Sequence, residues 1–340
     1  MKHIKRTTVQ EIAKKANVSL ATVSYVLNGK GSISSKTREK ILSIAQQMDY
    51  VPNRAARALR GARSNTIGVI INHMQNPFFS EVFIGIEKIA DKHGLTYLVS
   101  QTHDDPKREQ QQLINLAQNG VDGIILLSVT KSFNHILEIE DQYNIPIILI
   151  GNYFENVPLC GVVVDNYRGG LLATRHLLSL GDRKIIHIAG PQDQSMCSDR
   201  TKGFIDEMTR AGKQKINESI YYVDKMATES GFKIMDKIIK EQHLPISIFA
   251  VNDETALGIQ RFCRAKKLHV PKDIAVVGFS DIELIRTIDA DLTTVKIPST
   301  ALGEKVARML IDEIESENPK QCHLITLPVE FVVRGSTTLI

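Results

Sequence analysis

The sequence predicts a small all-α head at the N-terminus, followed by a larger α/β body with two parallel sheets. Three observations carry this prediction. Two short helical patterns joined by a turn occupy residues 8–28, and basic residues are concentrated in the first 64 positions. From Thr66 onward, short apolar segments alternate with amphipathic helical segments. The chain has 340 residues, 43% of them hydrophobic, which is enough apolar material for two or three domains.

The two N-terminal helices have clear sequence signals. Thr8 and Glu11 have the spacing of a capping box, and Ser19 is a suitable N-cap residue for the second helix. Helical periodicity gives each helix an apolar face, formed by Val9, Ile12, Ala13 and Ala16 in the first and by Val23, Val26 and Leu27 in the second. Asn17 and Val18 form the turn. The outward face of the second helix then presents Leu20, Ala21, Ser24 and Tyr25.

A third amphipathic helix is expected to begin at Ser34 or Ser35 and to complete a domain of about fifty residues. Its predicted apolar side consists of Ile41, Leu42, Ile44, Ala45 and Met48. A helix-turn-helix pattern on its own also fits a purely structural hairpin, so two interpretations are open at this point. In the other interpretation, the exposed second helix enters the major groove of DNA and reads base edges.

The charge distribution favours DNA. Residues 1–64 contain 13 lysines and arginines against 3 acidic residues, whereas residues 65–340 contain 29 basic and 35 acidic residues. The head therefore carries a net charge of +10 and the remainder one of −6. A solvated basic surface is the alternative, but it does not explain why the excess coincides with the helix-turn-helix pattern. We expect double-stranded DNA as the partner of the head.

Several other function classes lack their sequence signals. No apolar run approaches the roughly 20 residues that span a bilayer, and no signal-peptide core follows the N-terminus, so we expect a cytoplasmic protein. The cysteines form no Cys-x-x-Cys pair and the histidines have no ligand spacing, so we expect no metal and no cofactor. No phosphate-binding glycine loop, Gly-x-Ser-x-Gly motif or nucleophile–base pair identifies an enzyme.

The predicted domains are a head at 1–51, a hinge helix and linker at 52–65, and a body at 66–340. The hinge helix would have about two turns, and isolated helices shorter than about 12 residues are marginal in water. In the body, strands are predicted at 66–71, 95–100, 123–128, 146–150, 161–165, 184–189, 219–223, 246–251 and 274–279. Beyond them, 292–297 and 322–333 are predicted as strands around a helix at 302–314.

These strands are expected to form two doubly wound halves. The first would comprise about 66–165 and 292–322, and the second about 166–291 and 323–340, because the chain is expected to return to the first sheet near residue 292. Ligands of open parallel sheets bind outside the carboxyl ends of the strands. We therefore expect a ligand cleft between the two halves.

The chain from about Thr8 to Ser336 resembles the lac repressor/purine repressor family of bacterial transcription regulators. The resemblance rests on motifs that occur in order along the chain, at residues 53–59, 64–70, 76–79, 121–125, 164–166, 200–204, 252–258, 270–274, 277–281, 292–295 and 334–336. It implies a body of the periplasmic-binding-protein type that binds an effector and dimerises. It also implies a homodimeric repressor on a near-palindromic operator. The absence of a heptad tail after Ser336 favours a dimer over a tetramer.

The resemblance implies roles in DNA binding for individual residues. Ser19, Thr22 and Ser24 match positions that contact phosphate, and Leu20, Ala21 and Tyr25 match positions that read bases. Many members have arginine where Tyr25 stands, and arginine grips guanine bidentately whereas tyrosine cannot, so the operator should differ at that base pair. Leu59 matches a leucine that wedges into the minor groove, although a buried interface leucine is the alternative. Thr8, Asn28, Ser34, Asn53, Arg57 and Arg60 complete the expected set.

The same resemblance implies an effector site in the cleft. Phe78 and Phe79 are expected to stack on an apolar ligand face, with core packing as the alternative, and Arg200 matches the usual ligand clamp, with a structural salt bridge as the alternative. The remaining expected contacts are Gln194, Met196, Met226, Asn252, Asp253, Ser280 and Asp281. Several positions depart from the family: Ser280 replaces an aspartate, Met196 replaces a polar group of the purine repressor, and Gly151 and Ile297 replace polar contacts of the lac repressor.

Because these departures remove polar partners, a sugar is the default effector of the resemblance but its identity stays open. Whether the effector releases or strengthens DNA binding is also open. Both outcomes use the same two states of the repressor and differ only in which state the effector binds more tightly. A phosphoprotein corepressor acting on a DNA-binding regulator is an alternative. A transport-type solute-binding protein is a third possibility, against which the basic head and the missing signal peptide argue.

Overall fold

The computed structural model describes residues 7–27, 31–48, 50, 63–127, 132–154, 157–287, 290–316 and 323–338. The chain divides into two units, Met1–Ser64 and Asn65–Ile340, and the division falls at the end of the predicted linker. The predicted DNA contacts Asn28, Asn53, Arg57, Leu59 and Arg60 lie outside the described residues. Among the described helices, none is both long and apolar enough to cross a membrane.

The head contains α1 (Val9–Ala16), α2 (Leu20–Leu27) and α3 (Ser35–Gln47). The predicted capping box of α1 is confirmed: the Glu11 amide donates to Thr8 Oγ1 at 3.3 Å, and the Thr8 amide donates to Glu11 Oε2 at 2.8 Å. Asn17 ends α1 in the left-handed region, with φ of 57°. Ser19 Oγ accepts from the Thr22 amide at 3.1 Å, and Ser34, rather than Ser35, caps α3.

The three helices enclose a small apolar core. Its buried members are Ile12, Ala13, Ala16, Val23, Val26, Ile41, Ile44 and Ala45. The prediction for Leu42 was wrong, because this side chain is 46% exposed. The buried positions of α3 follow the helical spacing of Ile41, Ile44 and Ala45, and Leu42 is displaced from that stripe by about 100° around the helix axis.

The body contains two six-stranded sheets. The first has the order β11-β5-β4-β3-β1-β2 and is formed by β1 (Thr66–Ile71), β2 (Thr96–Gln101), β3 (Gly123–Leu126), β4 (Ile147–Ile150), β5 (Gly161–Val164) and β11 (Leu324–Leu327). The second has the order β12-β10-β9-β8-β6-β7 and is formed by β6 (Lys184–Ala189), β7 (Ile220–Tyr222), β8 (Ile246–Ala250), β9 (Ile274–Ser280), β10 (Thr293–Lys296) and β12 (Glu330–Val332). The predicted pair of doubly wound parallel sheets is confirmed. Among the described strands, only β10 and β12 pair in antiparallel fashion.

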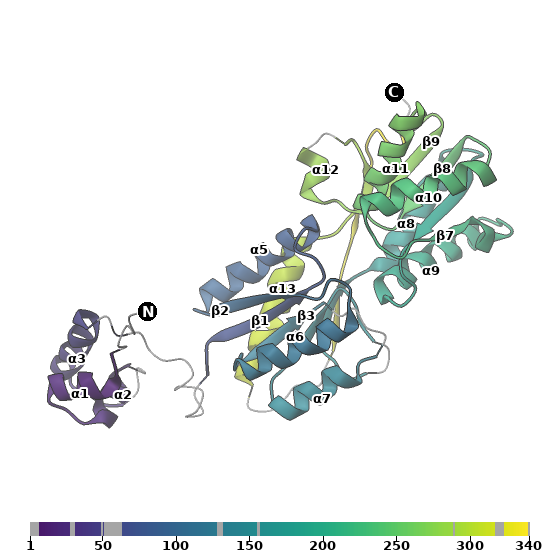
Figure 1. The fold of residues 1–340 in the computed structure, drawn as a ribbon. Helices are drawn as coiled ribbons and strands as arrows, with labels where there is room; N and C mark the ends of the chain where they lie inside the picture. The colour runs from purple at the N-terminus through teal and green to yellow at the C-terminus, as the bar shows by residue number, and fades with distance from the viewer. Residues whose placement is uncertain are drawn as a thin grey trace. The chain divides into compact units, whose positions relative to one another are not determined.

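Each sheet is covered by helices on both faces, as Figure 1 shows. The helices with the first sheet are α5 (Pro77–Lys92), α6 (Pro106–Gln118), α7 (Asn134–Tyr143) and α13 (Ser299–Glu315). Those with the second are α8 (Asn166–Ser179), α9 (Ser195–Arg210), α10 (Thr228–Glu241), α11 (Asp253–Lys266) and α12 (Glu283–Thr287), with a 3₁₀ turn at Ile216–Ser219. We call the first sheet with its helices the first lobe and the second sheet with its helices the second lobe.

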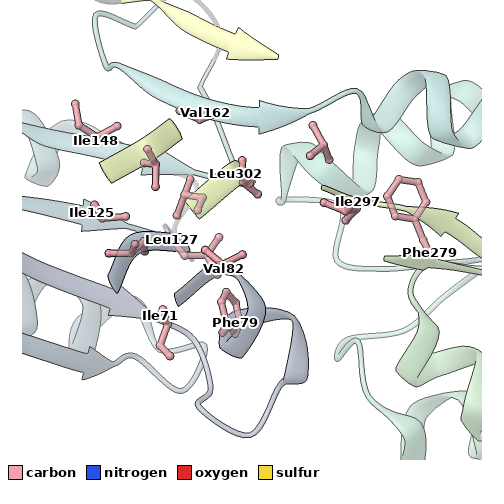
Figure 2. Packing of buried hydrophobic residues seen from close by; sticks show 14 of the residues in the cluster. Ile71, Phe79, Val82, Ile125, Leu127, Ile148, Val162, Phe279, Ile297 and Leu302 are labelled. Atoms are coloured by element: carbon pink, nitrogen blue, oxygen red, sulfur yellow. The ribbon is translucent and has the colours of Figure 1, made fainter. Parts of the chain in front are cut away.

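The strands of the first sheet distribute alternate side chains to two cores. Ile125 of β3 and Ile148 of β4 pack with Val82 of α5 and Leu302 of α13, as Figure 2 shows. The neighbouring residues of the same strands point to the opposite face, where they pack against α6 and α7: Ile124, Leu126, Ile147 and Leu149. Apolar side chains on both faces of a strand are the signature of a buried parallel sheet.

The chain crosses between the lobes at points that differ in part from the prediction. Residues 292–297 were expected in the first lobe, but β10 pairs with β9 of the second sheet. Residues 322–333 were expected as one strand, but they form β11 in the first sheet and β12 in the second. Pro328 follows β11 directly, and a proline cannot donate to a strand ladder. The segment therefore breaks there and changes sheets.

The helices α5 and α13 approach closely because glycine stands at their contact. A Cβ atom on Gly303 would lie 1.9 Å from Val82 O, and one on Gly85 would lie 2.1 Å from Thr300 O. Both opposing atoms belong to the backbone and cannot rotate away. A side chain at either glycine therefore requires the two helices to separate.

Gly303→Ala is expected to lower the free energy of unfolding of the body by about 2–3 kcal/mol, because the added methyl group must push α13 away from α5. Urea unfolding followed by circular dichroism measures this change. Ala301→Gly, at an exposed position of the same helix, is the control for helix propensity and is expected to cost about 1 kcal/mol. An unchanged or higher stability of Gly303→Ala would contradict the close packing.

A histidine lies in the core of the second lobe. His187 of β6 is fully buried, and its ring stacks on Phe249 with a centroid distance of 4.6 Å. Its Nδ1 donates to Phe249 O at 3.0 Å, and its Nε2 lies 3.1 Å from Thr201 Oγ1. Burial lowers the pKa of His187 to about 4, so the ring is neutral at pH 7.

Acid is therefore expected to destabilise the body through His187. The unfolded chain takes up a proton near pH 6.5 whereas the native chain does not, so the native state loses about 2–3 kcal/mol between pH 7 and pH 4.5. His187→Gln is expected to flatten this part of the stability profile, measured by urea unfolding at both pH values. The other titrating groups are the same in both proteins, so their contributions cancel when the two stability profiles are subtracted. Parallel profiles of the two proteins would refute the assignment.

Candidate functional sites

The exposed face of α2 is uncharged. Leu20 and Tyr25 are 50% and 51% exposed, Ala21 is exposed, and Ser24 is half-buried. The helix contains no charged residue among positions 20–27. A Cβ atom on Gly31 would lie 3.5 Å from Tyr25 Cγ, and the φ of 81° at Gly31 suits a residue without a side chain. The predicted base-reading positions thus form one surface of hydroxyl and apolar groups.

The head also presents polar groups at the starts of its helices and exposed basic side chains on α1 and α3. Thr8, Ser19 and Ser34 each stand at the N-terminus of a helix, where backbone amides favour phosphate oxygens. Thr22 Oγ1 lies 2.8 Å from Ser19 Oγ at the start of α2. The exposed basic side chains of the described part of the helices are Lys14 and Lys15 on α1 and Lys36 and Lys40 on α3. The head therefore has uncharged groups that can face bases and polar and basic groups that can face phosphates.

The body contains a cavity of about 410 Å³ between its two lobes. This volume suits a small molecule. The cavity is lined at the carboxyl ends of strands from both sheets, and it contains all but one of the predicted effector contacts: Phe78, Phe79, Gln194, Met196, Arg200, Met226, Asn252, Asp253 and Ser280. The expected cleft is thus present and contains nine of the ten predicted contacts, although other residues form most of its lining.

Asp281 is the exception. It does not line the cavity. Its Oδ1 accepts from Arg334 Nη2 at 2.7 Å and its Oδ2 accepts from Arg286 Nη1 at 3.2 Å. The expectation of an effector contact is corrected here, because this carboxylate is buried in ion pairs within the second lobe.

Arg200 lies at the floor of the cavity on α9. Its Nε donates to Asn166 Oδ1 at 3.0 Å, its Nη1 donates to Val251 O at 2.7 Å, and its guanidinium carbon lies 3.7 Å from the centre of the Phe279 ring. These three partners are uncharged, and the carboxyl groups of Asp253 and Asp199 also act on Arg200 through their charge. Burial lowers the pKa of Arg200 to about 10, which still leaves it protonated at pH 7.

Asn252 and Asp253 are held by the protein itself. Asn252 Oδ1 caps α11 by accepting from the Thr255 amide at 3.0 Å, and its Nδ2 donates to Met226 O at 3.1 Å. Asp253 accepts from Thr294 Oγ1 at 2.6 Å and from the Ile282 amide at 3.0 Å. Burial raises the pKa of Asp253 to about 6. These two side chains shape the floor and have few atoms left for a ligand.

Apolar side chains form much of the remaining wall. Phe78 and Phe79 meet edge to face with ring centroids 5.3 Å apart. Phe79 packs in the first-lobe core and also lines the cavity. Gly151 has a φ of 79°, and a Cβ there would lie 2.9 Å from Leu127 Cδ1. The other apolar lining residues are Val164, Pro191, Met196, Met226, Ala227, Ile282, Ile297 and Leu302.

Sequence reasoning missed a group of polar lining residues. Asn72 and His73 follow β1, Asp104 comes shortly after β2, and Asp224 and Lys225 follow β7. Glu254 lies in the first turn of α11 beside predicted contacts. All but Glu254 stand just beyond the carboxyl end of a parallel strand. The rule that ligands bind at those ends is the signal that identifies them.

Two families match the chain. Residues 8–53 match the family described as "Bacterial regulatory proteins, lacI family", and residues 64–334 match "Periplasmic binding proteins and sugar binding domain of LacI family". The chain is 36% identical over 335 residues to the HTH-type transcriptional regulator DegA of Bacillus subtilis, covering 98% of both chains. It is 35% identical to the ribose operon repressor of Halalkalibacterium halodurans, covering 97% of both.

Solved structures agree with these matches. The lac repressor dimer bound to operator and the anti-inducer ONPF is similar with a TM-score of 0.85 and 28% identity, covering 98% of this chain and 100% of that one. A LacI-family transcriptional regulator from Enterococcus faecium with bound ribose has a TM-score of 0.71 and 27% identity, covering 80% of this chain and 98% of that one. With both units matched in order along nearly the whole length, the chain belongs to the LacI family of bacterial DNA-binding transcriptional regulators.

Proposed function

We propose that this chain represses transcription by binding a near-palindromic operator as a homodimer, and that a small molecule in the cavity sets its operator affinity. One observation carries the proposal: a basic head with an exposed helix and a body with a polar-floored cavity occur in one chain. The protein acts by binding rather than catalysis, and it works in the bacterial cytoplasm where its DNA lies. The exposed side chains of Ile84 on α5 and Leu98 on the edge strand β2 support an interface between two copies.

The head contacts are proposed from the described surface. Leu20, Ala21 and Tyr25 read base edges, where apolar side chains favour thymine methyl groups. Phosphates are contacted near the helix N-termini by Thr8, Ser19, Thr22 and Ser34, and from the second turn of α2 by Ser24. Selection of bound duplexes from random DNA, using the full chain, tests the operator-binding function and yields the operator sequence. Recovery of unselected sequences would overturn it.

Tyr25→Arg is expected to change the operator. An arginine at this exposed position can form a bidentate pair with guanine, so selected sites should gain a G·C pair at one position of each half-site, with about tenfold or greater discrimination. The control Leu42→Arg adds the same charge at an exposed position of α3 and should raise affinity without changing base preference. Identical base preferences of Tyr25→Arg and the parent protein would refute the reading role.

The effector is proposed to be a small hydroxylated molecule. The ribose operon repressor is named for ribose, and the Enterococcus faecium regulator contains it. The cavity volume and the guanidinium of Arg200 fit a ligand of this size with hydroxyl groups. Gly151, Ser280 and Ile297 supply fewer polar atoms than the residues that other family members have at these positions. The cavity therefore offers fewer hydrogen-bond partners to a ligand with many hydroxyl groups. A screen of metabolites for release or strengthening of the operator complex tests the proposal.

Arg200→Lys is expected to lower the affinity for the effector found by that screen by about tenfold or more. The lysine ammonium group cannot replace the planar guanidinium group, which can donate to Asn166, Val251 O and the ligand at the same time. Operator affinity without effector should stay unchanged. Fluorescence anisotropy of labelled operator measures both. The control Arg264→Lys makes the same change at an exposed site of α11. Equal effector response in both variants would contradict the role of Arg200.

A further inference from the structure

Asn152 and Tyr153 of the first lobe form hydrogen bonds with the start of α9 in the second lobe. Both residues follow β4, whereas their partners Ser195 and Asp199 lie in the first two turns of α9. The Tyr153 amide donates to Ser195 Oγ at 2.9 Å, and this hydroxyl group donates to Asn152 Oδ1 at 3.3 Å. The Tyr153 hydroxyl group donates to the Asp199 carboxylate, with both oxygens at 3.2 Å. We call these four residues the clasp.

The clasp also bonds an amide that α9 cannot satisfy by itself. The first amides of a helix have no acceptor within the helix, and among the described residues Gln194 does not cap α9 with its side chain. The Met196 amide donates instead to Asn152 Oδ1 at 3.4 Å. Asn152 is only 6% exposed, so water competes little for this acceptor. A residue of the first lobe thus caps a helix of the second.

The turn of α9 that the clasp holds also forms part of the cavity. Met196 lines the cavity directly, and Gln194 and Arg200 line it from positions before and after Met196 in the chain. Gly151 of the first lobe, which precedes the clasp residue Asn152, lines the cavity too, and a Cβ atom on Gly151 would lie 3.4 Å from Met196 Cε. A ligand at this wall therefore contacts both of the segments that the clasp joins.

The clasp requires one particular arrangement of the lobes. β4 and α9 belong to different lobes, and the chain crosses between the lobes elsewhere, at 164–166, 296–299 and 327–330. A hydrogen bond is no longer formed beyond about 3.5 Å, so a displacement of α9 from β4 by about 1 Å breaks the clasp. By contrast, the Tyr167 hydroxyl group donates to Asp206 at 2.9 Å within the second lobe, and a movement of the lobes leaves this pair intact.

We propose that the clasp is a contact through which the effector controls the arrangement of the lobes. Its bonds form in the arrangement seen here and break when the lobes rearrange. An effector that keeps Gly151 and Met196 together strengthens the clasp, whereas an effector that separates them opens it. This inference rests on the proposed effector role of the cavity and goes beyond it, because it names the hydrogen bonds that change.

Hydrogen exchange of the full chain, followed by mass spectrometry with fragment ions, tests the clasp. The amides of residues 153 and 196 have acceptors in the opposite lobe, so their exchange reports how often the clasp opens. Tyr153→Phe removes only the hydroxyl group that donates to Asp199, and it is expected to speed exchange at both amides by about threefold or more. Unchanged exchange at both amides would refute the clasp.

Tyr167→Phe is the matched control. It also removes a tyrosine hydroxyl group that donates to an aspartate of α9, but this pair lies within the second lobe. Exchange at residues 153 and 196 is expected to match that of the parent protein. Equal acceleration by Tyr167→Phe and Tyr153→Phe would show a general loosening of α9 and would contradict an interlobe role.

Two substitutions of Asn152 separate its acceptor from its packing. Asn152→Asp keeps an acceptor for the Met196 amide, whereas Asn152→Leu has a similar size and no acceptor. Exchange at residue 196 is expected to rise by about threefold or more in Asn152→Leu and to stay near the parent rate in Asn152→Asp. Equal rates in the two variants would overturn the bond across the lobes. If Asn152→Leu is poorly folded, the comparison of Tyr153→Phe with Tyr167→Phe decides the matter.

Exchange with a bound small molecule tests the coupling. Ribose is the first probe, because the Enterococcus faecium regulator contains it, and the compounds that bind in the metabolite screen follow. The amide of Tyr153 is the reporter, since Tyr153 does not line the cavity and a ligand there does not cover it. A saturating compound that alters operator affinity is expected to change the exchange of this amide by about threefold or more, slower for a strengthened clasp and faster for an opened one.

The inference and the proposed function fail in different ways. If a compound binds the cavity and alters operator affinity while exchange at residue 153 stays the same, the inference is wrong and the proposed function stands. If no screened compound binds, the proposed effector role fails, and the coupling fails with it even where Tyr153→Phe shows that the clasp opens. A compound that changes operator affinity and exchange at residue 153 together supports both.

Discussion

Parallel strand pairing is the constraint on which both the cavity and its chemistry depend. In a parallel sheet, all carboxyl ends meet at one edge, and the loops that follow them converge there. The chain crosses between the lobes after β5, between β10 and α13, and between β11 and β12, and these crossings keep the two edges facing one cavity. Residues distant in sequence, such as Asn72, Arg200 and Asn252, thereby line a single site. Their convergence follows from topology rather than from any local motif.

The same constraint explains what sequence reasoning could and could not predict. Strand positions such as 66–71 and 184–189 coincide with β1 and β6, because buried parallel strands are short, continuous apolar runs. The sequence pattern of residues 293–296 and 324–327 predicts strands but not the sheet to which each strand belongs. A segment with strand propensity can pair with the edge of either sheet. Leu42 was wrongly predicted as buried because it follows the core residue Ile41 directly, and successive helix residues point about 100° apart around the axis. Asp281 was misplaced because its two arginine partners lie elsewhere in the chain.

The cavity differs from a pocket lined by unpaired polar groups. Arg200, Asn252 and Asp253 already have protein partners, so their positions do not depend on a ligand. A ligand adds bonds to remaining donors and acceptors and need not break existing ones. Such preorganisation lowers the entropic cost of binding. It also means that a ligand group facing Arg200 must accept a hydrogen bond, because the remaining polar atoms of this side chain are N–H donors.

Control of DNA binding requires that the effector distinguish two arrangements of the lobes, since a ligand that binds both equally shifts nothing. Contacts that join the lobes and that exist in only one arrangement can supply such a difference. Glu81 of α5 accepts from the Glu283 amide at 2.8 Å and lies 3.4 Å from Arg286. On another side, the Tyr153 amide donates to Ser195 Oγ at 2.9 Å. Because α5 also carries Phe78 and Phe79 of the cavity wall, a ligand that moves this wall must strain or reinforce the Glu81 contacts. The helix α5 thus carries part of the cavity wall, a contact with the second lobe and the exposed Ile84, which supports contact with a second copy.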